Sequence, residues 1–301
     1  MRLTQIRDFL AVFECGGIRA AARKLGVSQP TITKSVRALE TELHVQLFAR
    51  NARGLAPTAS GRAFFTRARV AHSELRKAEE EAAEAGGSSA GSVAFGIGPL
   101  SMVKIVPEAI ARFRRQFPRA RVRIVEGLSR VLLPSLRDET LDFVVTMRPV
   151  SEVDPTFRFR PLYRGELCVA VRKGHPLRHA RTLAELAGAD WLSMSTASRS
   201  GAFVARLFAS AGAPPPAPLI ECESINTLVA LLGTSDMLAV IQRLNLKQPL
   251  ARDVLQEIPI TDAIPSVTLG IFTRADTPLT RVAAAMVKNV TAVAREIARS
   301  G

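Results

Sequence analysis

The side chains best suited to chemistry in this sequence gather in residues 28–41, and they suit recognition rather than catalysis. The Gln29 amide can donate and accept at once, which matches the major-groove edge of adenine. Pro30 offers an apolar surface that suits the methyl group of thymine. Other residues of the stretch suit phosphate oxygens or the edge of guanine, and these are Thr31, Thr33, Lys34 and Arg37. An ordinary solvated helix face is the alternative interpretation.

A second basic pair, Arg50 and Arg53, lies at the turn formed by residues 51–54. Short segments on both sides of this turn predict a small hairpin with the two arginines near its tip. Such a tip can enter a flanking minor groove or grip phosphates. For Arg50, a role as a structural ion-pair partner is equally open.

Two segments beyond residue 91 suit a small organic anion. One precedes a predicted helix, whose first N–H groups attract negative charge. The other includes Arg199, which can hold a carboxylate or a sulfonate bidentately. The candidate residues of the two segments are Gly98, Pro99, Leu100, Ser101, Ser198, Arg199 and Ser200. For each of them a structural role, as a helix cap or as core filling, is as well supported.

Catalytic and metal-binding patterns are weak. The histidines and cysteines show no metal-ligand spacing, and they are His44, His72, His175, His179, Cys15, Cys168 and Cys222. An odd number of distant cysteines also argues against a disulfide framework. The sequence contains neither a nucleophile elbow nor a phosphate loop. We therefore expect neither an enzyme nor a bound metal or cofactor.

Composition narrows the class of protein further. The 301 residues carry 41 basic and 27 acidic side chains, a net charge of +14, and 47% are hydrophobic, which favours a folded protein with a polyanionic partner. No apolar run is long enough to span a membrane, and Asp8 and Glu14 interrupt the apolar N-terminus. We therefore expect a cytoplasmic protein. Residues 1–56 carry nine basic and four acidic side chains, so most of the excess charge lies elsewhere.

The elements that must position the first group are short helices. Ile6, Phe9, Leu10 and Phe13 share one helical face, and Ile18 to Leu25 predict a second helix that Gly26 ends. Ser28 is suited to cap a third helix, whose inward residues are Ile32, Val36, Leu39 and Leu43. With the hairpin, residues 1–57 predict a winged helix-turn-helix, an all-α domain apart from its wing.

Residues 58–86 predict one long helix. Small and apolar residues recur along it in a heptad pattern, and the predicted dimerisation residues are Phe64, Ala68, Ala71, Leu75, Ala78 and Ala82. A lone helix of this length cannot bury such a seam within itself, so a partner helix is implied. Residues 87–91 read as a hinge.

Beyond the hinge, strands and helices alternate, which predicts an α/β domain with largely parallel sheets. Strands are predicted at 92–98, 119–126, 142–147, 166–172, 191–194, 219–222, 238–241 and 267–273, and helices at 101–117, 130–138, 183–186, 200–211, 225–232 and 279–299. We expect two lobes with a cleft between them, the first from 92–162 and 267–301 and the second from 163–266. In the arginine-rich run 112–123, Val122 and Ile124 are expected to face the core and the arginines to face water or another subunit.

The N-terminal residues are similar to the signature of LysR-type transcriptional regulators, without gaps over residues 3–61. The matching residues are Leu3, Phe9, Val12, Gly17, Ala20, Ala21, Ala22, Leu25, Val27, Ser28, Gln29, Pro30, Thr33, Leu39, Glu40, Leu43, Leu47, Phe48, Arg50, Gly54, Leu55, Thr58 and Gly61. The resemblance implies a winged helix-turn-helix, a dimerisation helix and a two-lobed effector domain of the periplasmic-binding-protein type. It also implies a pseudo-palindromic double-stranded DNA operator and a dimer of dimers, and it adds to the effector pocket Ser129, Thr146, Met147, Phe203 and Ser224.

Within this family the C-terminal half is most similar to the regulator of toluenesulfonate degradation. Three stretches carry this similarity, and they lie at 222–224, 258–265 and 274–280. The similarity favours an anionic, sulfonate-like or aromatic effector. One departure bears on the pocket: family members often carry Ser or Thr where this chain has Gly98, so a common ligand hydroxyl is missing and Ser101 is a substitute.

Two other functions stay open on the sequence alone. A small-molecule-binding protein or an enzyme could carry a vestigial DNA-binding domain, although the intact residues 28–30 argue against this. A nucleoid-type architectural protein would bind DNA without sequence preference, and would not need the lobed C-terminal half.

Overall fold

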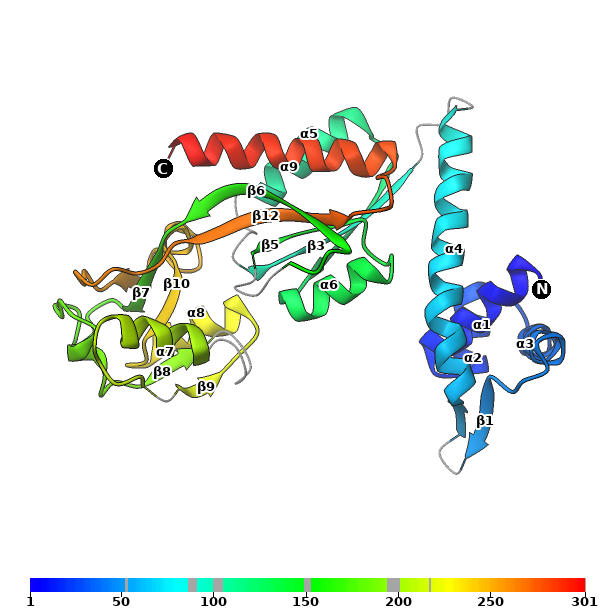
Figure 1. The fold of residues 1–301 in the computed structure, drawn as a ribbon, viewed down its shortest axis with the longest axis horizontal. Helices are drawn as coiled ribbons and strands as arrows, with labels where there is room; N and C mark the ends of the chain where they lie inside the picture. Colours follow the sequence, from blue (N-terminus) through cyan, green and yellow to red (C-terminus); the bar gives the residue numbers. More distant parts are fainter. Residues whose placement is uncertain are drawn as a thin grey trace. The chain divides into compact units, whose positions relative to one another are not determined.

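The computed structural model describes residues 1–51, 54–85, 91–99, 105–148, 153–193, 201–216 and 218–300. The chain divides into two compact units, one formed by residues 1–88 with 138–140 and one by the remainder. The first holds a winged helix-turn-helix and a long helix, and the second is an α/β domain (Figure 1). The predicted fold class is therefore confirmed. Except for Gly91, the predicted hinge at 87–91 lies outside the described residues.

Three short helices build the head, which we define as residues 1–57. They are α1 (Leu3–Cys15), α2 (Ile18–Leu25) and α3 (Gln29–Leu43). Gly16 and Gly26 end the first two helices in the left-handed conformation, with φ of 70° and 67°, a region that glycine enters without steric cost. The predicted inward residues pack together, and Phe9, Ile32 and Leu39 are fully buried.

The wing and the long helix complete the first unit. Strands β1 (Phe48–Asn51) and β2 (Gly54–Pro57) pair antiparallel, as the predicted hairpin requires. Helix α4 (Ala59–Ala85) packs against α1, where the rings of Phe13 and Phe65 stack with centroids 3.8 Å apart. No described helix, α4 included, is both long enough and apolar enough to cross a membrane.

The heptad positions of α4 fall into two groups. Phe64 and Ala68 pack within the hydrophobic core of the head, so their own chain already covers them. Ala71, Leu75, Ala78 and Ala82 are exposed along the rest of the helix. Only this second group leaves an apolar seam open to a partner helix.

A five-stranded sheet forms the first lobe of the α/β unit. Its order is β4-β3-β5-β12-β6, and the strands are β3 (Ser92–Ile97), β4 (Arg121–Glu126), β5 (Phe143–Met147), β6 (Phe157–Gly165) and β12 (Val267–Arg274). Helices α5 (Ile105–Gln116) and α9 (Arg281–Ser300) cover one face, while α6 (Ser129–Arg137) covers the other (Figure 1). Alternate residues of each strand therefore serve two separate cores.

The second lobe is built on two smaller sheets. Strand β7 (Leu167–Arg172) lies between β10 (Ala239–Gln242) and β11 (Leu255–Glu257), and β8 (Trp191–Ser193) pairs with β9 (Pro218–Glu221). Its helices are α7 (Gly201–Ser210), α8 (Ile225–Thr234) and two single-turn segments, Ala184–Leu186 and Arg243–Lys247. The buried Trp191 ring meets Phe208 edge to face, with centroids 5.4 Å apart.

Three expectations about this domain are wrong in detail. The sheets are mixed rather than largely parallel, because β12 returns from the second lobe antiparallel to β5 and β6, and β7 pairs antiparallel with both neighbours. Strands β6 and β11 were not expected; β6 is an edge strand that contains Pro161 and exposed arginines, a pattern that hides a strand from sequence analysis. Ile124 is 42% exposed, since β4 is also an edge strand.

Candidate nucleic-acid interface and effector site

The local sequence fixes where α3 begins and which way it faces. The Ser28 side chain accepts a hydrogen bond from the Thr31 backbone N–H at 3.3 Å, which confirms the predicted N-cap, and Pro30 lies in the first turn. At the other end, His44 adopts a left-handed conformation. Ile32, Val36 and Leu39 are buried against α1 and α2. The opposite face of α3 is therefore directed outward.

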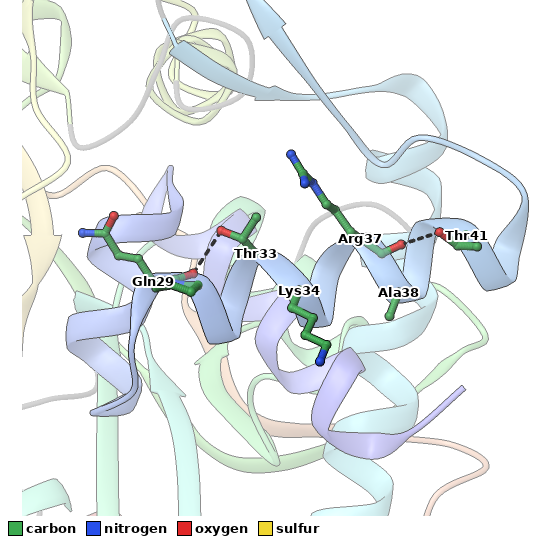
Figure 2. Close-up of a pocket in the computed structure, with 7 residues that line it drawn as sticks. Gln29, Thr33, Lys34, Arg37, Ala38 and Thr41 are labelled. Atoms are coloured by element: carbon green, nitrogen blue, oxygen red, sulfur yellow. Dashed lines mark hydrogen bonds between the residues drawn. The ribbon is translucent and has the colours of Figure 1, made fainter.

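That outward face carries a row of side chains along a shallow groove, which we call the α3 row. Its residues are Gln29, Pro30, Thr33, Lys34, Arg37, Ala38 and Thr41 (Figure 2). Gln29, Lys34 and Arg37 are exposed, and Figure 2 shows all three side chains extending away from the helix. The predicted outward placement is confirmed, and the row combines one amide, two cations and several small apolar groups on a single helix.

The hydroxyl groups near the α3 row are bonded within the helix. Thr33 Oγ1 donates to the Gln29 carbonyl oxygen at 3.0 Å, and Thr41 Oγ1 donates to that of Arg37 at 2.9 Å. Ser28 Oγ and Thr31 Oγ1 lie 2.8 Å apart at the cap. The Ser28, Thr31 and Thr33 bonds lie in the first turn of α3, and all of these bonds use hydroxyl protons that could otherwise be donated to DNA.

A carboxylate for which no role was predicted, that of Glu40, ties α3 to the wing. Glu40 Oε1 accepts hydrogen bonds from the backbone N–H groups of Leu47 at 2.8 Å and Phe48 at 3.0 Å. Thr58 Oγ1 donates to the Gln46 carbonyl oxygen at 2.7 Å from the other side. The sequence did carry a sign of this role, because Glu40 is a charged residue that directly follows the buried Leu39, near the end of an amphipathic helix.

The wing arginines are only partly visible. The backbone of Arg50 pairs with Leu55 in the β1–β2 ladder, but its side chain is not described, and Arg53 lies outside the described residues.

Elsewhere in the head, an ion pair of 2.7 Å links Lys24 to Glu14, and this hydrogen bond raises the pKa of the Lys24 ammonium above its ordinary value. Lys24 therefore stays charged at neutral pH.

In the first lobe of the effector domain, two predicted pocket residues meet. Ser129, at the start of α6, and Thr146, near the end of β5, have their hydroxyl oxygens 3.1 Å apart. Thr146 is buried. Both lie at the carboxyl edge of the parallel strands β3 and β5, where α/β folds usually bind ligands. The structure thus brings together residues that are distant in sequence.

The Thr146 hydroxyl also explains the glycine at position 98. A Cβ atom on Gly98 would lie 2.6 Å from Thr146 Oγ1, closer than real contacts allow. The absence of a side chain at position 98 thus leaves room for the Thr146 hydroxyl from β5. Pro99 is buried beside it, whereas Leu100 and the proposed substitute Ser101 lie outside the described residues.

Fewer of the candidate effector-binding residues of the second lobe lie among the described residues. Ser224 caps α8 by accepting from the Thr227 backbone N–H at 3.3 Å. Its neighbour Glu223 forms an ion pair with Arg130, the neighbour of Ser129, so the starts of α6 and α8 lie close to each other. Met147 packs against the first-lobe core. Phe203 lies in α7, and Ser198, Arg199 and Ser200 lie outside the described residues.

Three other side chains in this lobe bear on its chemistry. The Ser193 hydroxyl, at the end of β8, is buried and has no hydrogen-bond partner within the described part of the chain. Burial raises the pKa of the Cys168 thiol to about 12, and it also raises that of Cys222. These thiols are therefore protonated at neutral pH. Across the described residues, no group of histidine, cysteine and acidic side chains is arranged to hold a metal ion.

Family comparisons match both units. The family described as bacterial regulatory helix-turn-helix protein, lysR family, matches residues 3–62, and LysR substrate binding domain matches residues 86–295. The HTH-type transcriptional regulator GalR of Pseudomonas putida is 31% identical over 89% of this chain and 67% of its own. The SDS degradation transcriptional activation protein of a Pseudomonas strain is 30% identical over 79% of this chain and 78% of its own.

Solved structures share the fold over nearly the whole chain. CbnR, a LysR family transcriptional regulator, superposes with a TM-score of 0.73 at 22% identity, over 98% of this chain and 99% of that one. Full-length CbnR complexed with its target DNA gives 0.71 at 23% identity, over 97% and 100% of the two chains. A full-length OxyR variant from Pseudomonas aeruginosa gives 0.70 at 22% identity, over 96% and 94%.

Proposed function

The chain belongs to the LysR family of bacterial helix-turn-helix regulators, and we propose that the α3 row is the surface with which it reads its operator. It is a DNA-binding transcriptional regulator with a C-terminal effector-binding domain, and not an enzyme. The observation that carries the proposal is the exposed row on the outer face of a capped helix, whose inner face is fully packed.

Four members of the row, and four residues near it, have roles that their chemistry supports. Gln29 pairs with an adenine edge and Pro30 covers a thymine methyl group. Lys34 and Arg37 neutralise phosphates and give most of the salt-dependent affinity. Arg50 and Arg53 carry the wing into a flanking minor groove, and Ser28 and Thr31 keep the first turn of α3 in register with the bases.

For the effector domain we propose a small organic anion bound between the two lobes. The paired hydroxyls of Ser129 and Thr146 and the Arg130–Glu223 ion pair bring polar groups from both lobes to one region. The Ser193 hydroxyl, Ser224, Phe203 and the segments 98–101 and 198–200 complete the proposed wall. The relative named for SDS degradation is consistent with a sulfate- or sulfonate-like ligand class.

The proposed assembly is a dimer, paired through the exposed part of the α4 seam, and two such dimers form a tetramer. Two heads then read a pseudo-palindromic site, because the symmetry of the protein is matched by that of the DNA. The effector favours one arrangement of the heads by binding it more tightly.

The test of the proposed DNA recognition is selection from a randomised duplex library by the full-length chain, followed by salt titration. We expect one enriched sequence with two related half-sites, and an affinity that falls steeply with salt. Enrichment of no sequence, with equal binding to all duplexes, would instead support an architectural protein.

The test of the proposed effector class is thermal unfolding measured with benzoate and with 4-toluenesulfonate. An upward shift is expected with an anion of this class, because a ligand that binds only the folded state stabilises it. If neither anion nor any related acid raises the unfolding temperature, the proposed ligand class is wrong.

A further inference from the structure

The hydroxyl proton of Thr33 is already used within α3. Thr33 Oγ1 donates to the Gln29 carbonyl oxygen at 3.0 Å, and a threonine hydroxyl has only one proton to donate. Phosphate oxygens and the N7 and O6 atoms of guanine are acceptors only. With this bond in place, Thr33 cannot donate to any of them.

The methyl group of Thr33 remains available to a base. Figure 2 shows the hydroxyl turned toward Gln29 and the methyl group turned away from that bond. Pro30 is exposed three residues earlier, so the two side chains are neighbours on the helix surface. Together they form an apolar step next to Gln29, which lies four residues before Thr33 on the same face of the helix. The C5-methyl of thymine is the apolar group that base edges present in the major groove.

We infer that Thr33 is a thymine reader, whose methyl group packs on a thymine methyl in each half-site, beside the thymine covered by Pro30. This inference rests on the proposed function of the α3 row and adds the chemistry of one position to it. It replaces the phosphate or guanine contact expected from the residue type alone. The DNA partner is then a half-site rich in A·T pairs, read by one amide and two apolar contacts.

Two substitutions separate the methyl group from the hydroxyl group. Thr33→Ser keeps the hydroxyl and removes the methyl, whereas Thr33→Val keeps the methyl and removes the hydroxyl. On the duplex that the full-length chain selects from a randomised library, we expect Thr33→Ser to bind about fourfold more weakly, the effect of one buried methyl group. Thr33→Val should bind more tightly than Thr33→Ser, because it retains the methyl group.

Replacing thymines by uracil, one at a time, removes the same contact from the DNA. The parent chain should lose about fourfold in affinity at the thymine that Thr33 covers. Thr33→Ser should lose nothing further at that position, because the two changes delete one shared contact and are not additive.

Thr66 provides the matched control. It is exposed on α4 and its hydroxyl makes the same backward bond, to the Arg62 carbonyl oxygen at 3.2 Å. Thr66→Ser and Thr66→Val should both leave the affinity unchanged. If Thr33→Val weakens binding while Thr33→Ser does not, or if uracil lowers the affinity of Thr33→Ser as much as that of the parent chain at every position, the inference is wrong and the proposed function stands. If the chain selects no duplex at all, the proposed function fails and the inference falls with it.

Discussion

The head and the effector domain hold their candidate residues in opposite ways. In the head, the α3 row lies exposed on one face of a single helix. Hydrogen bonds between the side chains of Glu40 and Thr58 and nearby backbone groups fix the surrounding segments. In the effector domain, the candidate hydroxyls of Ser129 and Thr146 come from different elements and bond to each other, and Thr146 is buried.

This difference teaches how each site is specified. A surface site on one helix requires only that the helix be held in place, so most of the interactions that support it lie on the buried face of that helix. A site between elements depends on close packing, so a change of one atom at Gly98 is felt at Thr146. We therefore expect the two regions to respond differently to changes that test their support.

The largest effect is expected at Gly61, where α4 passes the turn before the wing. A Cβ atom there would lie 2.0 Å from the Leu47 carbonyl oxygen, a backbone atom that cannot move alone. Gly61→Ala should destabilise the head by about 3 kcal/mol or more and abolish operator binding. Fluorescence of Trp191, the single tryptophan, reports on the effector domain and should show an unchanged transition. A shifted Trp191 transition would contradict the separation of the two regions.

A smaller effect is expected at Glu40. Glu40→Ala leaves two backbone N–H groups without their acceptor, and this should cost about 2 kcal/mol of head stability. Glu40→Gln keeps an acceptor oxygen and should lose less. Thermal unfolding followed by far-ultraviolet circular dichroism measures both variants. Equal losses in the two would mean that the charge, and not the pair of bonds, holds the wing.

Gly98 should respond more mildly than Gly61, because the obstacle is a side chain. Gly98→Ala should cost about 1 to 2 kcal/mol, measured by Trp191 fluorescence during unfolding. Gly98→Ala should cost much less stability in a Thr146→Ala background than in the parent chain, since the two side chains compete for one space. Strict additivity of the two changes would show that the Thr146 hydroxyl does not set the glycine.

The smallest effect is expected from acid in the second lobe. Hydrogen bonds from Thr182 and from the Arg181 and Thr182 backbone hold the pKa of Glu185 below its ordinary value of 4.5. Its contribution to stability is therefore present above that value and is lost as the pH falls through and below it. Glu185→Gln should flatten this part of the curve of unfolding temperature against pH. If the variant and the parent give parallel curves, Glu185 does not carry the acid response.

The head could be predicted almost completely from the sequence. Its helices follow apolar spacing, its ends follow Gly16, Gly26 and Ser28, and the outward face of α3 follows from its inward residues. The back-bonding of Thr33 could not be predicted, because Thr in a helix has two available rotamers and residue type does not choose between them.

The effector domain was predictable in its alternation but not in its pairing. The return of β12 from the second lobe and the edge strand β6, with Pro161 in it, depend on long-range contacts that local pattern does not encode. For the same reason the Ser129–Thr146 contact and the Ser193 hydroxyl, unpartnered among the described residues, became visible only in the folded chain.

The most direct test of the central claim is the specificity ratio of the Gln29→Ala variant. Binding of the selected duplex and of a scrambled duplex is titrated at several salt concentrations, for the variant and for the parent chain. We predict that Gln29→Ala lowers affinity for the selected duplex about tenfold or more and leaves the scrambled duplex, the salt dependence and the unfolding temperature unchanged. An unchanged ratio between the two duplexes would show that the α3 row does not read the operator.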